Sequence, residues 1–345
     1  MRIIQEKIAG PVFRSRILEE YFSSGNMVIA DIETTGLSPR SSQVVLGGMV
    51  VPDGDDRLAV QYFADSPEDE EELLDRYAAM LAEYDVIVTY NGNAFDLPFL
   101  KKRMKAHRID AERLERCCSM DLYRILKKYS ALPQILPDLK QKTVEKYMGA
   151  GQSRRDTIDG AESVRLYYQY VRSRGPQREK LLDRILLHNR DDIVKLSEIM
   201  SILGHLDLHE IMYAEGCPVR TERASAIIRN SLVNSRGMSI EGDVFGAAGS
   251  YRSFTGGVEA EVDEKGHFSI SFRTEKVGGY SVADLKAIGA DYPELRELPG
   301  YESGYLILRD PEKKICYHEV NRLAGTLVEK LLGEIRFPEQ IRMML

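Results

Sequence analysis

Acidic side chains at three separated places in the 345-residue chain have the residue types and spacing of metal ligands. Asp31 and Glu33 lie two residues apart in the apolar segment MVIADIE, where the alternation of a β-strand places both side chains on one face. Two carboxylates on the buried face of a strand are costly to desolvate unless a cation or hydrogen bonds compensate them. Because an isolated pair of this kind usually lies on a solvent-exposed face, its interpretation depends on the rest of the chain.

The second acidic position is Asp96, in the segment YNGNAFDLPFL. A short apolar run ends there in an Asn-Gly turn, and a helix is predicted to begin with Asp96 in its first turn. Helix capping and the helix dipole would explain an acid at this place without any further function. Ligands of open α/β sheets, however, gather at the carboxyl ends of strands, which is where Asp96 is expected.

The third segment, LLHNRDDIVKL, is predicted to lie inside a long helix. His188 and Asp192 are four residues apart and are therefore neighbours on one helical face, whereas Asp191 points about 100° away. Taken singly, such a pair usually lies on the solvent-exposed face of a helix and has no further function. Together the three segments supply four carboxylates and one histidine, enough hard ligands for two divalent ions about 3.5–4 Å apart that hydrolyse a phosphodiester. The histidine would add proton transfer near neutral pH.

The elements that must position these residues follow from hydrophobic periodicity. Strands are predicted over residues 27–33, 43–51 and 57–64, and the turn signals between them indicate an antiparallel meander. The apolar run at residues 85–91 is typical of a strand buried on both faces, and a further short strand is predicted at 119–122. Helices are predicted at residues 14–22, 67–83, 97–106, 122–129, 139–148, 161–172 and 177–203. Such a succession indicates a mixed α/β fold.

The long third-segment helix is expected to stop within residues 204–218, which divides the chain into domains 1–204 and 205–345. In the second domain one hairpin is predicted to turn at residues 263–266 and another at 310–313. A closing helix is indicated by an apolar stripe consisting of Val320, Leu323, Ala324, Leu327, Val328, Leu331 and Leu332. The second domain is therefore expected to be a smaller α+β unit, and its sequence indicates no chemistry.

Composition and charge narrow the class of protein. The 43% hydrophobic and 29% charged residues are ordinary for a globular protein, and the four cysteines lack zinc-ligand spacing. A formal charge of −7 argues against a protein that coats duplex nucleic acid through bulk electrostatics. The first ten residues lack the apolar run of a secretory signal, and no later run is long enough to span a bilayer. We therefore expect a cytoplasmic protein with no membrane association.

The three segments resemble the motifs of a known superfamily. DIETTGL, YNGNAFDLPFL and HNRDDIVKL are similar to the exonuclease motifs of the DEDD superfamily, and most closely to those of the YprB-type ribonuclease-H-like exonuclease family. The resemblance covers about residues 27–203, including LPDLKQKTVEKYMG and DTIDGAESVRLYYQY. It implies a ribonuclease-H-like mixed sheet flanked by helices, with residues 205–345 outside it.

By this resemblance Asp31, Glu33, Asp96 and Asp192 would be the ligands of two divalent ions, Mg²⁺ or Mn²⁺, with Asp31 bridging both. His188 would orient or deprotonate the attacking water. The chain departs from the family pattern here, because the known subclasses place a tyrosine four residues before the last aspartate or a histidine five before it. In this chain a histidine stands at the four-residue spacing.

Further residues are candidates for contact with the substrate. In the resembled family the residues after the first motif line the pocket for the terminal nucleotide, which here are Thr34, Thr35 and Leu37. The substrate-side positions of the second motif correspond to Asn91, Asn93 and Phe95. Charge alone suggests phosphate contacts for Arg154, Arg155, Lys140 and Lys142.

The leading hypothesis is a 3′-to-5′ exonuclease that acts on single-stranded DNA or RNA ends. A second hypothesis is a catalytically inactive nucleic-acid-binding module on the same fold. The intact set of four carboxylates argues against it, because a site that has lost its activity is not expected to keep every metal ligand. A third hypothesis keeps the metals and makes the chain a structure-specific endonuclease.

Overall fold

The computed structural model describes residues 1–345 apart from 23, 157, 235, 248 and 338–345. The chain divides into two compact units, Met1–Leu206 and Asp207–Leu345, each with its own sheet structure. Among the described residues, no helix has both the length and the apolar character needed to cross a membrane.

The first unit is built on a six-stranded sheet. In spatial order its strands are β1 (Arg2–Ile8), β4 (Asp56–Phe63), β3 (Val44–Asp53), β2 (Met27–Thr34), β5 (Val86–Thr89) and β6 (Cys118–Asp121). The four strands from β1 to β2 pair antiparallel, whereas β2, β5 and β6 run parallel to one another. The carboxyl ends of β2, β5 and β6 therefore meet at one edge of the sheet, where ligands of α/β proteins gather.

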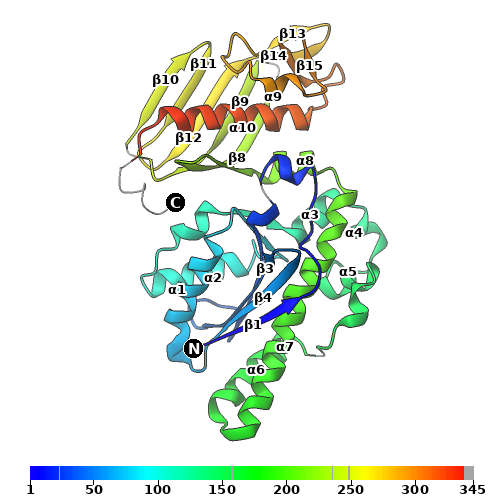
Figure 1. The fold of residues 1–345 in the computed structure, drawn as a ribbon, viewed down its shortest axis with the longest axis vertical. Helices are drawn as coiled ribbons and strands as arrows, with labels where there is room; N and C mark the ends of the chain where they lie inside the picture. Colours follow the sequence, from blue (N-terminus) through cyan, green and yellow to red (C-terminus); the bar gives the residue numbers. More distant parts are fainter. Residues whose placement is uncertain (23, 157, 235, 248, 338–345) are drawn as a thin grey trace. The chain divides into compact units, whose positions relative to one another are not determined.

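Helices cover both faces of this sheet (Figure 1). The α-helices are α1 (Glu70–Leu81), α2 (Asp96–Ala106), α3 (Leu122–Tyr129), α4 (Leu132–Ile135), α5 (Gln141–Tyr147), α6 (Gly160–Arg172) and α7 (Gly175–Ile199). Short 3-10 helices are η1 (Leu18–Glu20), η2 (Ser24–Asn26), η3 (Pro67–Asp69), η4 (Glu112–Arg116), η5 (Ala150–Ser153) and η6 (Met200–His205). One apolar cluster joins the sheet to α1 and α2, for example through Tyr77 and Phe99, and the other joins it to α6 and α7 through Tyr170 and Ile185. Each such fully buried side chain contributes about 1.5–3 kcal/mol to folding.

Two consecutive glycines of β3 let helices approach both faces closely. A Cβ atom on Gly47 would lie 2.8 Å from the Tyr77 ring of α1, and one on Gly48 would lie 2.0 Å from Asn189 Oδ1 of α7. Tyr77 uses this approach to donate its hydroxyl to the carbonyl of Gly48 at 2.8 Å. Both positions therefore exclude side chains because two helices pack there.

The sequence-based prediction of a ribonuclease-H-like mixed sheet flanked by helices is confirmed, and two local predictions near the N-terminus need correction. Within the described part of residues 14–22, the helical structure is limited to η1, because this short segment lacks the long apolar face that stabilises a helix. Strand β1, which pairs antiparallel with β4, was not among the predicted strands. Its mixture of charged and apolar residues is typical of an edge strand, which has a partner on one side only.

The second unit holds two antiparallel sheets. The larger, in spatial order, consists of β10 (Tyr251–Thr255), β11 (Val258–Val262), β12 (His267–Arg273), β9 (Gly237–Phe245), β8 (Ser225–Val233) and β7 (Cys217–Arg220). The smaller consists of β13 (Glu275–Val277), β14 (Tyr280–Asp284), β16 (Tyr305–Arg309) and β15 (Tyr301–Glu302). The unit also contains α8 (Leu208–Glu215), α9 (Pro293–Arg296) and α10 (Tyr317–Glu334). Helix α10 packs against β7, β8 and β16 through its apolar stripe, which gives an α+β unit.

The first hairpin predicted in this unit is present, and the second is present as its turn, in which the N–H of Lys313 donates to the carbonyl of Asp310 at 3.0 Å, with a second strand that is reduced to one bridge. Strands β11 and β12 pair across a turn in which Asp263 accepts the backbone N–H of His267 at 2.9 Å. After β16, by contrast, an isolated bridge joins Arg309 to Ile315, and α10 begins at Tyr317. The helix prevails because the residues beyond the turn bury an apolar stripe at helical spacing, beginning with Val320.

Candidate metal centre

Strand β2 presents its two acids to helix α7. Asp31 Oδ2 accepts a hydrogen bond from Asn189 Nδ2 at 2.8 Å, and Glu33 Oε1 lies 3.5 Å from His188 Nε2. The two acids thus meet consecutive residues of the same helix, as the alternation of the strand predicts. Glu33 is only 8% exposed, so this face of the strand is not a solvated one.

The third carboxylate arrives from the neighbouring strand. Asp96 is the first residue of α2, which follows β5, and β5 is parallel to β2. Its Oδ1 atom accepts the backbone N–H of Ile32, the residue between the two acids of β2, at 3.2 Å. Asp96 is 7% exposed, and its carboxylate therefore lies beside the acidic face of β2, away from bulk water.

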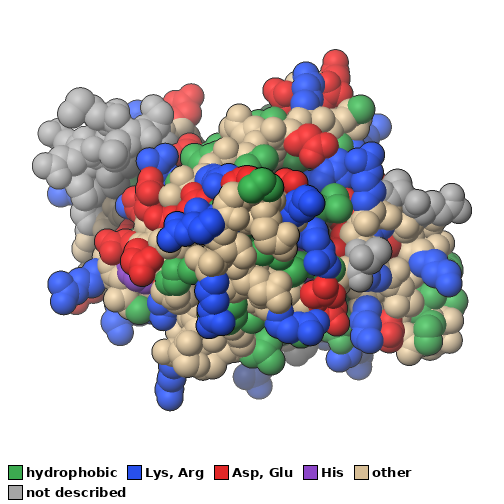
Figure 2. Space-filling model, turned by 90° about the horizontal axis from the view of Figure 1, so that it is seen from below, with side chains coloured by type: hydrophobic (Ala, Val, Ile, Leu, Met, Phe, Trp, Pro, Cys, Tyr) green, Lys and Arg blue, Asp and Glu red, His purple; other side chains and the backbone are tan. Residues whose placement is uncertain are grey.

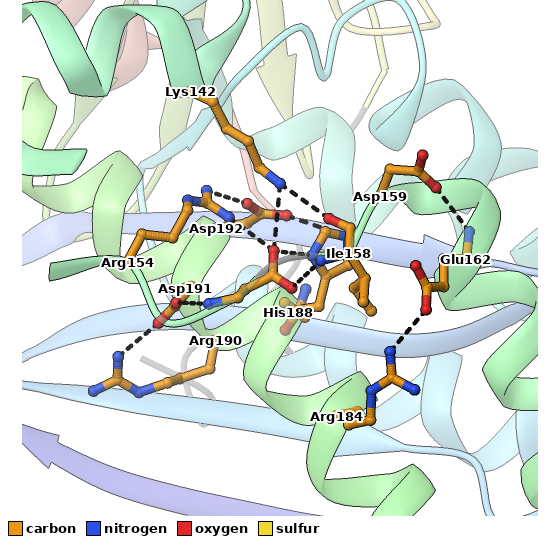
Figure 3. Close-up of polar contacts among 12 residues, drawn as sticks. Lys142, Arg154, Ile158, Asp159, Glu162, Arg184, His188, Arg190, Asp191 and Asp192 are labelled. Carbon is orange, nitrogen blue, oxygen red and sulfur yellow. Dashed lines mark hydrogen bonds and ion pairs between the residues drawn. The ribbon is translucent and has the colours of Figure 1, made fainter. Parts of the chain in front are cut away.

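The fourth carboxylate lies one turn beyond His188 on α7. Asp192 Oδ2 is 3.8 Å from His188 Nε2, and Asp192 Oδ1 accepts a hydrogen bond from Arg154 (Figure 3). One ligand atom each from Glu33, His188 and Asp192 lie within 4.8 Å of one another. These ligand atoms are therefore close enough together to hold a metal ion.

Burial and neighbouring charges both influence the ionisation of these acids. Burial, together with the charges of Asp96, Asp192 and Glu33, raises the pKa of Asp31 well above its ordinary value. Burial also raises the pKa of Glu33 to about 7, against the opposing charge of His188, and the pKa of Asp96 to about 6. Burial disfavours the charged form of His188, but the charges of Glu33 and Asp192 outweigh it and raise its pKa.

A divalent cation fits this donor set. Buried carboxylates with raised pKa values lack the positive charge that would stabilise their ionised forms. Carboxylate oxygens are the hard ligands that Mg²⁺ and Mn²⁺ prefer. The chemistry of these side chains therefore matches such ions, which would supply the missing charge.

Several polar residues that the sequence analysis missed hold this centre in place. Asn189 is fully buried, and its Oδ1 atom accepts a hydrogen bond from Gln61 Nε2 at 2.9 Å. This contact orients the amide so that its nitrogen faces Asp31. Only the glycine pair in the predicted strand at 43–51 indicated in the sequence that another element packs closely there. Gly48 leaves the space that Asn189 fills.

Asp191 points away from the centre, as the helical spacing predicts, and binds the backbone of the segment that carries Asp156. It is fully buried, and its Oδ2 atom accepts the backbone N–H groups of Arg155 at 2.6 Å and Asp156 at 2.9 Å. The Asp156 carboxylate then accepts a hydrogen bond from His188 Nδ1 at 2.7 Å. Neither contact has a sequence signal, because the residues lie more than 30 positions apart.

The candidate pocket residues after the first motif form a loop that holds itself together. Thr34 Oγ1 donates to the carbonyl of Gly36 at 2.8 Å, and Thr35 Oγ1 accepts the N–H of Gln43 at 2.9 Å. Leu37 projects from this loop and is 86% exposed. An apolar side chain so exposed is available for contact with a ligand.

The candidates of the second motif surround the start of α2. The backbone N–H groups of Asn91 and Asn93 donate to the Asp121 carboxylate, at 2.8 and 3.1 Å. Asn91 adopts a left-handed conformation with φ of 65°, which this turn requires. The Phe95 ring lies 5.4 Å from that of Phe99 and packs against the core. Asp121, at the end of β6, is thus the residue that fixes this turn.

The basic candidates differ in their surroundings. Arg154 is almost fully buried and forms ion pairs with Glu145 at 2.9 Å and Asp156 at 3.2 Å, besides its contact with Asp192. Arg155 is exposed, as is Lys140. Lys142 Nζ donates to the carbonyl of Ile158 at 3.0 Å and lies 3.4 Å from the Asp156 carboxylate.

The mixed sheet, its flanking helices and the acids gathered at its parallel edge define a ribonuclease-H-like nuclease fold. The chain belongs to the RNase_H superfamily, whose family model matches residues 28–204. Nucleases of this superfamily generally use divalent metals, and the acidic group described above could bind one.

Individual proteins are similar to parts of the chain. The uncharacterized protein YprB of Bacillus subtilis is 30% identical over 181 residues, which are 51% of this chain and 41% of that protein. A DNA polymerase of Methanocaldococcus jannaschii is 54% identical over 41 residues, or 12% of this chain and 2% of the polymerase. The solved structure of the family B DNA polymerase from the archaeon Pyrobaculum calidifontis matches with a TM-score of 0.40 and 16% identity, covering 91% of this chain and 48% of that one. The chain thus spans less than half of the length of each of these proteins.

The raised pKa values predict how the stability of the metal-free protein depends on pH. Because Glu33 and Asp96 have higher pKa values in the folded state, about 7 and about 6, than in the unfolded chain, protonation favours folding. Their contribution is fully present below the unfolded pKa values and is lost as pH rises through the folded ones. Between about pH 5 and pH 8 the free energy of unfolding should fall by on the order of 3 kcal/mol.

Urea denaturation in a metal chelator measures this effect. Asp96→Asn keeps an oxygen for the Ile32 N–H but cannot ionise, so the variant should lose part of the pH dependence. Glu162→Gln, which alters an acid paired with Arg184 outside the centre, should keep all of it. The same pH profile in wild type and Asp96→Asn would contradict the burial of charge at this position.

Proposed function

We propose that the chain is a 3′-to-5′ exonuclease that hydrolyses single-stranded DNA or RNA ends with two divalent cations, Mg²⁺ or Mn²⁺. The observation that supports this function best is the grouping of Glu33, His188 and Asp192, with the Asp96 carboxylate held against the backbone of β2. The resemblance of the three motifs to those of DEDD exonucleases supports the polarity. We assign the activity to residues 1–204, with residues 205–345 as a separate α+β domain.

The proposed ligands are Asp31, Glu33, Asp96 and Asp192, of which Asp31 would contact both cations. When bound, such a cation pair activates water and stabilises the leaving oxygen of a phosphodiester. The buried carboxylates hold the required negative charge at fixed positions, because Asn189 orients Asp31 and the β2 backbone orients Asp96. Binding of cations would also free Asp192 from the Arg154 guanidinium, which now neutralises it.

His188 is the proposed proton acceptor of the attacking water. Its Nε2 atom faces Glu33 and Asp192, whereas Nδ1 is occupied by the contact with Asp156. The nitrogen on the side of the proposed ligands is thus the one available for proton transfer. The four-residue spacing between His188 and Asp192 therefore brings the imidazole to the proposed centre.

Local charge supports a nucleic-acid substrate despite the overall charge of −7. Residues 122–155 contain only two acids, Asp138 and Glu145. Eight basic residues stand in the same stretch: Arg124, Lys127, Lys128, Lys140, Lys142, Lys146, Arg154 and Arg155. On the face drawn in Figure 2, Lys and Arg side chains are interspersed with Asp and Glu. The basic stretch flanks the centre, so it is the proposed contact for the substrate backbone.

Removing one proposed ligand tests the function. Asp31→Asn should reduce the Mg²⁺-dependent release of nucleotides from a single-stranded oligonucleotide by at least about 100-fold, since metal catalysis contributes several kcal/mol. Asp159→Asn is the matched control, because Asp159 caps α6 through the Glu162 N–H and asparagine caps a helix equally well. The control should keep wild-type activity.

The product lengths decide between functions. A 5′-labelled strand that shortens stepwise supports removal of nucleotides from the 3′ end. Discrete internal cuts would identify an endonuclease, and binding without cleavage would identify an inactive module. Full activity in Asp31→Asn would contradict the proposed centre.

The exposed basic residues should affect substrate binding alone. Arg155→Ala and Lys140→Ala should each raise KM a few-fold and leave kcat unchanged, because a phosphate contact gives affinity and no chemistry. The slope of log KM against log salt concentration should fall by about 0.7 for each contact removed from a single strand. Lys105→Ala, in the last turn of α2, should change neither quantity. A loss of kcat without a change in the salt slope would refute this assignment.

A further inference from the structure

Asp156 makes more contacts than a simple partner of His188 would need. Its carboxylate is 2% exposed, and its Oδ2 atom accepts a hydrogen bond from His188 Nδ1 at 2.7 Å. The same oxygen lies 3.2 Å from Arg154 Nη1 and 3.4 Å from Lys142 Nζ. Oδ1 accepts the backbone N–H of Ile158 at 2.9 Å. The Asp156 carboxylate is therefore held by several partners, of which the His188 imidazole is one.

Asp191 explains how Asp156 reaches the imidazole. Both His188 and Asp191 belong to α7, so the helix fixes the distance between them. The Asp191 carboxylate accepts the backbone N–H groups of Arg155 and Asp156 and is itself fully buried. A buried carboxylate is tolerated when such hydrogen bonds satisfy it. The segment that carries Asp156 is thereby attached to the helix that carries His188.

The contact with Asp156 determines which nitrogen of His188 carries the proton. A neutral imidazole carries a proton on only one nitrogen, and an ionised carboxylate accepts hydrogen bonds but donates none. The contact with Asp156 therefore keeps the proton on Nδ1 of His188. In the neutral imidazole the lone pair is then on Nε2, which lies 3.5 Å from Glu33 Oε1 and 3.8 Å from Asp192 Oδ2.

We propose that Asp156 is a positioning residue, which sets the tautomer and the direction of His188, and that Asp191 places it. The proposal rests on the proposed nuclease function, since it specifies how His188 is prepared to accept a proton there. It also accounts for the departure in spacing from the resembled exonucleases. A histidine one turn before the last aspartate is directed to the acids by a carboxylate from outside the three motifs.

Kinetics separate positioning from binding. In Asp156→Ala, kcat should fall about 10–100-fold, as expected when the partner of a functional histidine is removed, while KM and the affinity for Mn²⁺ stay within about twofold. Asp191→Ala should cause a similar loss of kcat although Asp156 is still present. Glu162→Ala, which removes a half-buried acid of α6 that pairs with Arg184, is the control and should retain wild-type values.

Spectroscopy of the imidazole gives a readout that does not depend on activity. Long-range ¹H–¹⁵N correlation spectra of the Mg²⁺-loaded wild type should show neutral His188 with its proton on Nδ1. Asp156→Ala should lose this preference. Wild type with the proton on Nε2, or an unchanged Nδ1 tautomer in Asp156→Ala, would overturn the proposal, even if the variants fold poorly or the kinetics agree.

These outcomes also distinguish the two levels of inference. A wild-type protein without nuclease activity would defeat the proposed function, and the tautomer measurement would still decide the relation between Asp156 and His188. Losses of kcat that are matched by equal losses of Mn²⁺ affinity would show that Asp156 only maintains the metal ligands, and would overturn its role toward His188.

Discussion

The burial of several carboxylates in one place is the constraint on which the first unit depends. Asp31, Glu33 and Asp96 lie where burial raises their pKa values, so the folded chain opposes their ionisation. Such a cluster persists only when hydrogen bonds, protons or cations offset its charge. In the structure Asn189 donates a hydrogen bond to Asp31, and Arg154 pairs with Asp192. A divalent ion would supply the positive charge that these contacts leave unmatched.

The sheet and helix α7 together position the acidic cluster. Strand β2 lies where the antiparallel and parallel parts of the sheet meet. Its acids and Asp96, which begins the helix after β5, therefore lie toward the same edge of the sheet. Helix α7 then contributes His188, Asn189 and Asp192 within little more than one turn, and the absence of a side chain at Gly48 lets this helix approach. Precise placement of ligands on a strand and on helices, which are more rigid than loops, suits a site that must hold ions in fixed positions.

Local patterns in the sequence predicted most of the elements that carry the centre, because β2, α2 and α7 have strong periodicity and the acids lie at regular spacings on them. The same reasoning failed where tertiary contacts decide. Strand β1 is stabilised by pairing with β4, and the strand predicted after the turn at 310–313 is reduced to one bridge because α10 begins at Tyr317. The roles of Asp156 and Asp191 could not be predicted, since their partners lie more than 30 positions away and leave no periodic signal. Hydrophobic periodicity predicts which face of an element is buried, but it does not predict which polar side chains contact one another.

The most direct test of the central claim is a calorimetric titration of the full chain with Mn²⁺. If the buried acids form a cation centre, the wild type should bind Mn²⁺, and the binding should be lost or greatly weakened when Asp96, whose carboxylate lies beside β2, is changed to asparagine. The Asp159→Asn variant should bind as the wild type does. Equal binding by all three proteins, or no binding by the wild type, would contradict the account.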